Sequence, residues 1–181
     1  MTHFFKKYMS DIYDISSSID CATLLRCSQM VSETNDAGGQ VLIFGNGGSA
    51  AMASHVSVDL VKAARVRASN FNEADLITCF SNDFGYENWV KKSIEFYAQT
   101  NDLVVLISSS GSSANMLNGA LMARQMKLPM ITLSGFDELN PLRAMGDVNL
   151  YAASSSYNYV EMTHHIWLVA IVDHIINEKA K

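Results

Sequence analysis

Two carboxylate–imidazole pairs are the residues of this chain best suited to acid–base chemistry. His55 and Asp59 lie four residues apart, and Glu161 and His165 have the same spacing near the C-terminus. Residues four apart on a helix share one face, so the members of each pair can act together. Carboxylates and imidazoles serve as general acids, general bases or zinc ligands. The same residues could instead be hydrogen-bonded structural side chains, and spacing alone leaves both interpretations open.

Two loops have a composition that could hold an anion. The glycine loop, 45–49, reads Gly-Asn-Gly-Gly-Ser, and the serine loop, 108–113, reads Ser-Ser-Ser-Gly-Ser-Ser. Glycines let the backbone turn sharply close to a ligand, and Ser49 would lie at a helix N-terminus, where N–H groups favour anions. Hydroxyls and backbone N–H groups can bind phosphate oxygens without lysines. The alternative is a plain glycine turn with Ser49 as an N-cap, followed later by a serine-rich cap.

A third loop, 81–86, reads Ser-Asn-Asp-Phe-Gly-Tyr and follows an apolar run. Its acid, Asp83, could accept hydrogen bonds from sugar hydroxyls. An Asx-turn, in which the carboxylate bonds the local backbone, explains the same residue equally well.

Apolar runs that alternate with helical patterns predict the elements that position these loops. We expect strands at 41–44, 76–80, 103–107, 129–133 and 148–151, and helices at 49–63, 87–98, 114–126 and 158–177. Such alternation predicts an α/β fold, a doubly wound, mainly parallel sheet of about five strands flanked by helices. In such sheets ligands bind beyond the carboxyl ends of the strands, where the three loops would lie.

The length of 181 residues suits one domain, which we expect to span 1–181. A helical segment, 1–38, precedes the first strand and should lie outside the sheet, while 39–181 form the α/β core. Apolar positions at helical spacing in this first segment favour a packing or subunit surface.

Charge and hydropathy exclude several classes of partner. The net charge is −5 and no basic cluster exceeds two lysines, which argues against nucleic acid. No apolar run approaches the ~18 residues of a membrane span, and the N-terminus lacks a signal-peptide pattern. We therefore expect a cytoplasmic protein with no membrane partner. The cysteines at 21, 27 and 79 have no CxxC spacing, and we interpret them as small core residues.

With these residues in view, the chain resembles the sugar isomerase (SIS) domain family, of the bacterial phosphoheptose isomerase type. The glycine loop, Ser-Asn-Asp-Phe-Gly at 81–85, the serine loop followed by Ala-Asn, and a final helix bearing Glu and His occur in the family's order. The resemblance covers nearly the whole chain and implies a flavodoxin-like fold. It also implies aldose–ketose isomerisation of a phosphosugar such as sedoheptulose 7-phosphate, in a homotetramer with active sites at subunit interfaces.

The resemblance also assigns site residues. The positions it implies for substrate binding are Asn46, Gly47, Ser49, Asp83, Ser108, Ser109, Ser110 and Ser113. For catalysis we expect Glu161 as the base, His55 and His165 as proton donors, and Asp59 orienting His55. Some members of the family bind zinc, and the corresponding ligand set here would be His55, Asp59, Glu161 and His165.

Three positions depart from the family pattern. Asp59 replaces a glutamate, Glu161 replaces a glutamine, and Val169 stands where the family has a histidine eight residues further on. His165, one turn nearer on roughly the same face, or its neighbour His164, could substitute for that histidine. These changes put the particular sugar in question more than the fold.

Two other functions remain open from the sequence. The chain could be a non-catalytic SIS module that senses a sugar phosphate or acts as a protein adaptor, which Val169 favours and the retained acids and imidazoles oppose. It could also use a dinucleotide, since 45–50 fit the Rossmann glycine pattern. That pattern also requires an acidic residue at the end of the second strand. None follows the apolar run at 76–80, so we expect no nucleotide cofactor.

Overall fold

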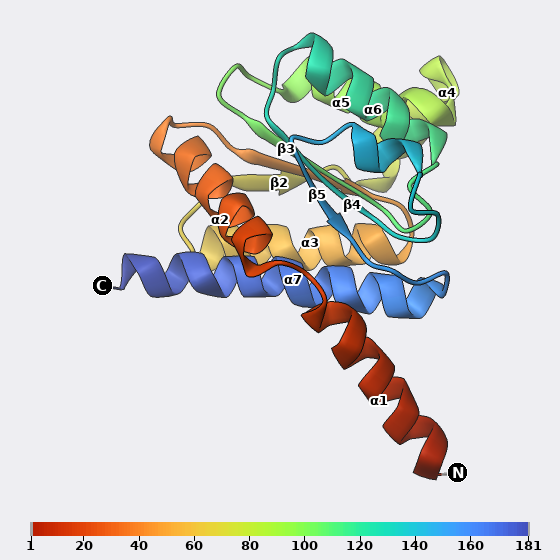
Figure 1. The fold of residues 1–181 in the computed structure, drawn as a ribbon. Helices are drawn as coiled ribbons and strands as arrows, with labels where there is room; N and C mark the ends of the chain where they lie inside the picture. The colour runs from red at the N-terminus through yellow and green to blue at the C-terminus, as the bar shows by residue number, and fades with distance from the viewer. Residues whose placement is uncertain (1, 181) are drawn as a thin grey trace.

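A five-stranded parallel sheet forms the centre of the computed structural model, which describes residues 2–180. The strand order is β2-β1-β3-β4-β5 (Figure 1). The strands are β1 (Val41–Gly45), β2 (Ala68–Asn70), β3 (Leu103–Ser108), β4 (Met130–Ser134) and β5 (Val148–Tyr151). The three central strands are buried along their whole length because helices cover both faces, as their unbroken apolar runs predict. The predicted doubly wound fold is confirmed.

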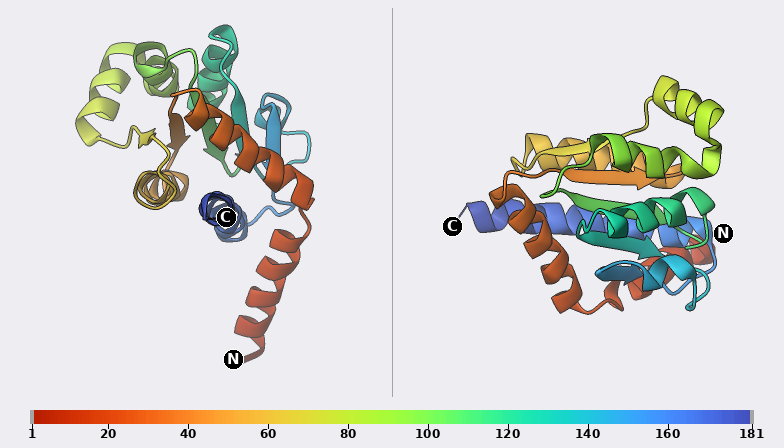
Figure 2. Two further views of the ribbon diagram at one scale, coloured as in Figure 1. Left: turned by 90° about the vertical axis from the view of Figure 1, so that its left-hand side faces the viewer. Right: turned by 90° about the horizontal axis from the view of Figure 1, so that it is seen from above.

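Helices pack on both faces of the sheet (Figures 1 and 2). One apolar core lies beneath α2, α3 and α7, and the other beneath α4, α5 and α6. The first helix, α1, extends away from the body. The helices are α1 (Thr2–Ser17), α2 (Cys21–Asp36), α3 (Gly48–Lys62), α4 (Ala74–Phe84), α5 (Trp89–Tyr97), α6 (Ala114–Gln125) and α7 (Tyr157–Lys179), with short 3-10 turns η1 (Tyr86–Asn88) and η2 (Pro141–Ala144). None of these helices is long and apolar enough to cross a membrane.

The predicted second strand, 76–80, is wrong: these residues lie inside α4. The β-prone types Ile, Thr and Phe suggested a strand, but Leu76, Ile77 and Phe80 lie on one helical face, which packs against the core beside α5. The true second strand, β2, is three residues long, has no large apolar residue and is held by pairing with Val41–Ile43 of β1. A strand this short carries no hydrophobic signal.

The interpretation of the cysteines as core residues is correct for one of three. Cys27 is fully buried on the core-facing side of α2, and burial raises the pKa of its thiol to about 12. Cys21 and Cys79 are exposed, and all three are free thiols. At these two positions residue type alone was misleading.

His164 attaches α7 to the end of β4 from inside the core. It is fully buried, and its Nε2 donates to the backbone carbonyl of Ser134 at 3.0 Å. A carbonyl only accepts, so Nε2 carries the proton and Nδ1 is an acceptor, for which the described chain offers no partner. Because burial penalises the charged ring, the pKa of His164 falls from 6.5 to about 4.

This shift makes stability depend on pH with a defined sign. Between pH 6.5 and 4 the unfolded chain binds a proton at position 164 that the folded chain excludes. The free energy of unfolding should therefore fall as the pH drops through this window, by about 3 kcal/mol from this residue alone. His164→Asn lacks this titrating group and should not lose that stability. In urea unfolding, the free energy of unfolding of the variant minus that of wild type should therefore be about 3 kcal/mol more favourable at pH 4 than at pH 7. A difference that stays constant with pH would contradict the buried neutral imidazole.

Candidate functional site

The glycine loop and the serine loop lie side by side at the carboxyl ends of β1 and β3. These strands are neighbours, with Gly45 paired to Ile107. Beyond them the side chains of Asn46 and Asn115 join the two loops. Each amide donates to the oxygen of the other, at 3.1 and 2.8 Å. Chain order reverses between these strands, and this is where ligands bind in doubly wound sheets.

Two helices begin at this junction without a side-chain cap. α3 starts after Gly47 and α6 starts after Ser113, and neither preceding residue makes a capping hydrogen bond through its side chain. The N-terminal turn of a helix carries N–H groups and a partial positive charge. Two such turns at one sheet edge suit an anion such as a phosphate group.

The hydroxyls of the serine loop are organised into two bonded pairs. Ser108 donates to Ser113 at 3.1 Å, and Ser112 donates to the oxygen of Ser110 at 3.1 Å. Ser108 and Ser109 are buried, whereas Ser110 and Ser113 are half-exposed. Ser49 is buried in the first turn of α3. The exposed edge of the loop therefore presents hydroxyls whose orientation is already set.

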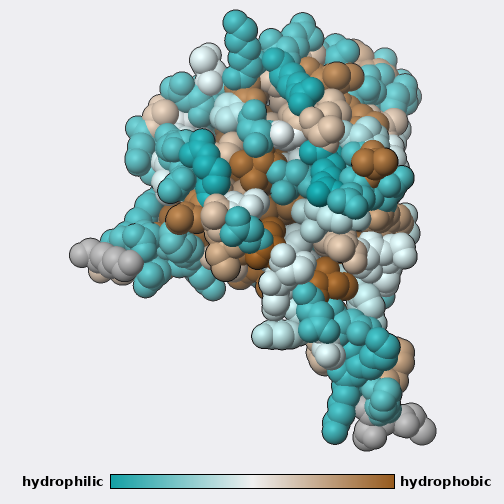
Figure 3. Space-filling view, viewed as in Figure 1, coloured by the Kyte–Doolittle hydropathy of each residue, from teal (hydrophilic) through white to brown (hydrophobic). Residues whose placement is uncertain are grey.

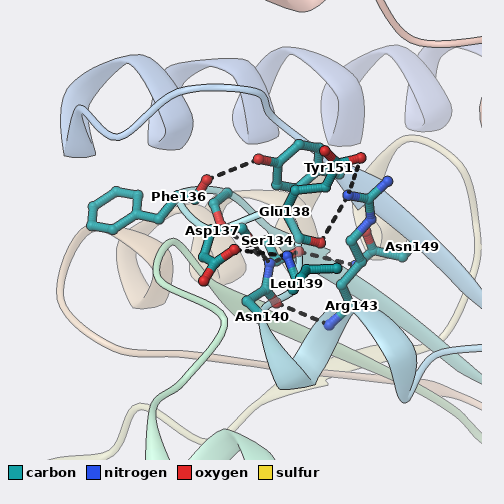
Figure 4. Close-up of polar contacts among 10 residues, drawn as sticks. Ser134, Phe136, Asp137, Glu138, Leu139, Asn140, Arg143, Asn149 and Tyr151 are labelled. Carbon is teal, nitrogen blue, oxygen red and sulfur yellow. Dashed lines mark hydrogen bonds and ion pairs between the residues drawn. The ribbon is translucent and has the colours of Figure 1, made fainter.

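The segment after β4 supports the serine loop from behind. The backbone N–H of Gly135 donates to Ser109 at 2.9 Å, and that of Leu142 donates to Gly111 at 3.0 Å. Asn140 is buried, and its side chain would collide with any Cβ at Gly111, so only glycine fits there. The Asn140 amide donates to the carbonyl of Asp137 at 2.7 Å (Figure 4). These contacts fix the loop before any ligand arrives.

Asp59, His55 and His165 form a hydrogen-bonded chain between α3 and α7, which we call the imidazole chain. The Nε2 of His55 lies 3.0 Å from Asp59 Oδ2, and its Nδ1 lies 2.8 Å from His165 Nε2. A carboxylate only accepts, so His55 donates to Asp59 and accepts from His165. Partial burial and the neighbouring His55 lower the pKa of His165, with Asp59 acting in the opposite direction.

Glu161 lies at the glycine loop, one turn of α7 before His165. Its carboxylate occupies the space in which a Cβ at Gly48 would stand, so residue 48 must be glycine for this approach. Gly48 is the first residue of α3, beside Asn46 and Gly47. A carboxylate therefore lies directly against the loop that could hold an anionic ligand, and the imidazole chain follows along the same two helices.

Among the predicted site residues, Asp83 is not brought to this junction by any contact. It lies exposed on α4, where its carboxylate accepts from Asn82 at 2.9 Å. The prediction placed it after a strand, at the ligand-binding edge of the sheet, and it follows no strand. Its proposed contact with a substrate stays a prediction.

The imidazole chain contains the side-chain types that bind zinc, but these side chains bond to one another instead of pointing at a common centre. Both nitrogens of His55 are directed to protein partners, Asp59 and His165. Within residues 2–180 no group of three or more His, Cys, Asp or Glu side chains is disposed to hold a metal ion. As arranged, these residues do not fit zinc. Zinc binding remains a prediction from the family resemblance.

The position of Val169 separates the two candidate replacements for the family histidine. Val169 lines an apolar groove of about 680 Å³ between α1 and α7, together with His165 and His55. His164 points the opposite way, into the core. Only His165 therefore shares a surface with position 169.

Three residues that the sequence did not mark as functional line a cavity of about 300 Å³ on the α4 side of the glycine loop. Asn72, Tyr86 and Trp89 line it together with Asn46. The Tyr86 hydroxyl donates to Asn46 Oδ1 at 3.0 Å, which connects η1 to the paired amides. The glycine and aromatic residues at 85–89 are a weak sign of a binding loop. Because 76–80 were predicted as a strand rather than as part of α4, these residues were expected to follow a strand.

Comparisons with known proteins agree with this geometry. The family model described as "SIS domain" matches residues 5–135. A phosphoheptose isomerase of Campylobacter concisus is 31% identical over 92% of this chain and 88% of its own length. One from Helicobacter hepaticus is 34% identical over 78% of this chain and 74% of its own length.

A solved structure extends the similarity to the whole fold. The phosphoheptose isomerase of Neisseria gonorrhoeae superposes with a TM-score of 0.87 at 24% identity, and the match covers 96% of each chain. At this identity the superposition supports the fold, while the family model and the two more similar sequences support the family. On these grounds the chain belongs to the SIS domain family.

Proposed function

We propose that this chain is a phosphosugar isomerase that interconverts an aldose phosphate and a ketose phosphate, such as sedoheptulose 7-phosphate, through an enediol. The observation that carries the proposal is the Glu161 carboxylate against Gly48, at the loop joined to the serine loop through Asn46 and Asn115. A base thus lies beside an anion cradle. The names of the Campylobacter and Helicobacter relatives support the same activity.

The reaction moves one proton between adjacent carbons and another between their oxygens. Glu161 is the group that removes the proton from the carbon next to the carbonyl and returns it to the neighbouring carbon. His165 follows Glu161 by one turn on the same helical face, so the imidazole chain can give a proton to one oxygen and accept one from the other. Asp59 would hold His55 in the tautomer that accepts from His165.

The serine loop and the N-terminal turns of α3 and α6 would hold the phosphate. These groups are remote from the reacting carbons, and binding energy gained there positions the sugar against Glu161. No lysine or arginine is needed, because uncapped helix starts and hydroxyls supply the donors.

A sugar-phosphate sensor without catalysis is the second candidate, and Val169 favours it. The family resemblance places a histidine there, and in this chain the position contributes only apolar surface to the groove. The contact between His165 and His55 opposes this candidate because it retains an imidazole at the same surface.

We also infer that the chain assembles with copies of itself, with the homotetramer of the family resemblance as the expected form. α1 stands away from the body (Figures 1 and 3). It exposes the side chains of Phe4, Phe5, Met9 and Tyr13. The apolar groove between α1 and α7 adjoins this face and contains His55 and His165. A second chain seated there would complete the site at a subunit interface. A cytoplasmic location likewise stays a prediction.

Turnover and exchange at carbon test the proposed activity. In D₂O, purified protein incubated with five-, six- and seven-carbon sugar phosphates should introduce deuterium at the carbon next to the carbonyl, as read by NMR. Glu161→Gln should lower the rate by at least about a hundredfold, since base catalysis of this kind contributes that much. Parallel samples with zinc and with chelator test the metal prediction. Binding without exchange for every sugar would select the sensor instead.

Gly48→Ala serves as a structural control for Glu161. The added Cβ meets only the flexible end of the Glu161 side chain, so the fold should keep its melting temperature while the carboxylate is displaced. The exchange rate should fall as in Glu161→Gln. Full activity in this variant would show that the position of Glu161 against the glycine loop is irrelevant.

Light scattering after size exclusion tests the assembly. Wild type should elute with the mass of four chains, and Met9→Asp, at a residue 65% exposed on α1, should reduce that mass. Leu139→Asp is the matched control because Leu139 is 88% exposed and lies on the loop after β4, outside α1 and outside the lining of the groove. A wild-type mass of one chain would reject the proposed assembly.

A further inference from the structure

Asn140, in the loop after β4, is a buried residue whose side-chain amide is bonded at both ends (Figure 4). Its oxygen accepts from the backbone N–H of Arg143 at 3.0 Å and so caps η2. Its nitrogen donates to the carbonyl oxygens of Asp137 at 2.7 Å and Gly135 at 3.2 Å. Because a carbonyl only accepts, these contacts fix which end of the amide is nitrogen. Both ends are used within the protein, so the side chain serves other residues rather than a ligand.

The residue that Asn140 serves is Gly111 of the serine loop. The φ of Gly111 is +64°, a left-handed conformation that favours glycine, and the Asn140 side chain occupies the space in which a Cβ at Gly111 would stand. The turn that Asn140 caps reaches the same residue, since the N–H of Leu142 in η2 donates to the Gly111 carbonyl at 3.0 Å. Asn140 therefore holds Gly111 both by direct contact and through η2.

Contacts with the segment after β4 set the direction of two peptide groups in the serine loop. The carbonyls of Ser109 and Gly111 accept from backbone N–H groups of that segment, at 2.9 and 3.0 Å. No peptide bond within residues 2–180 is cis, so the N–H that follows each carbonyl points the opposite way. The N–H groups of Ser110 and Ser112 are therefore turned away from the segment after β4.

These two N–H groups are available to an anion. Within residues 2–180 that of Ser110 has no acceptor, and that of Ser112 makes a long contact of 3.3 Å to the Ser110 hydroxyl. Ser110 is half-exposed and Ser112 is exposed. Successive backbone N–H groups around a left-handed residue form a concavity that binds anions. The left-handed residue here is Gly111, whose conformation Asn140 supports.

We propose that Asn140 is a positioning residue that holds the serine loop in the conformation that binds phosphate. The proposal rests on the proposed function, from which it takes the phosphate at this loop. With Asn140 in place the N–H groups are oriented before the ligand arrives. Without it, ordering the loop becomes part of the cost of binding. The loss should therefore appear in affinity and not in the turnover of the bound complex.

The split between KM and kcat tests this role. In Asn140→Ala the KM for sedoheptulose 7-phosphate should rise roughly three- to tenfold, the cost of ordering a short loop on binding. The kcat should stay within about twofold of wild type, because Glu161 and the imidazole chain are not moved. In calorimetric titration, inorganic phosphate should lose affinity by a similar factor. A lower kcat with an unchanged KM would overturn the proposal.

Asn140→Ser is the conservative variant. Serine is a preferred N-cap and can keep the start of η2, but it lacks the amide that lies against Gly111 and bonds Asp137. Its affinity for inorganic phosphate should fall by at least about twofold and by less than that of Asn140→Ala. If Asn140→Ala does not fold, wild-type affinity in Asn140→Ser overturns the proposal.

Asn149→Ala is the matched control. Asn149, on β5, donates to Ser134 Oγ at 3.3 Å, the same atom that Asn140 contacts at 3.2 Å (Figure 4). Its other hydrogen bonds go to Thr132 on β4 and not to the serine loop. The variant should melt at a lower temperature than wild type, with unchanged KM and phosphate affinity. An equal loss of affinity in both alanine variants would reveal general damage to the fold and overturn the proposal.

The remaining outcomes separate this proposal from the proposed function. Unchanged affinity in Asn140→Ala, with turnover by wild type, would overturn the proposal alone. Weaker phosphate binding by Asn140→Ala, without turnover by wild type, would reject the isomerase and still support the role of Asn140. Failure of wild type to bind either sedoheptulose 7-phosphate or inorganic phosphate would overturn both.

Discussion

β1 and β3 are neighbours in the sheet although β2 separates them in the chain, and the site depends on this adjacency. The chain leaves β1 in one direction to form β2 and returns on the other side to form β3, so the loops after β1 and β3 meet with nothing between them. The reciprocal bonds between Asn46 and Asn115 then hold the two loops at one distance. Both loops lead into helices that begin without a side-chain cap. The Asn46–Asn115 pair therefore positions the serine-loop hydroxyls and the N-terminal turns of α3 and α6 relative to each other.

α7 connects this junction to the acid–base residues through its periodicity. Glu161 and His165 share the face that packs along α3, while His164, between them in sequence, turns into the core and bonds the end of β4. Successive residues of a helix point about 100° apart, so His164 and His165 face different sides of α7. The buried contact of His164 fixes the rotation of α7, and this rotation places Glu161 against Gly48. Core packing and site geometry are therefore set by the same helix.

The sequence predicted the features that carry strong hydrophobic or compositional signals. The apolar runs of β1, β3 and β4 and the glycine and serine loops after the first two were recognised, since parallel strands buried on both faces are wholly apolar. β2 was missed because a three-residue edge strand depends on backbone pairing rather than on side chains. The error at α4 followed from this, and with it the expectation that Asp83 follows a strand. The support that Asn140 gives to the serine loop was invisible from sequence, because its contact with Gly111 is recognised only once the fold brings the two residues together.

The central claim is that the glycine and serine loops grip one phosphate group together. A crystal structure of the protein with bound sedoheptulose 7-phosphate measures this directly. The account predicts the phosphorus within hydrogen-bond reach of the serine-loop hydroxyls and the start of α6, with the carbonyl end of the sugar at Glu161. A phosphate bound elsewhere, or held by only one of the two loops with the sugar directed away from α7, would contradict it.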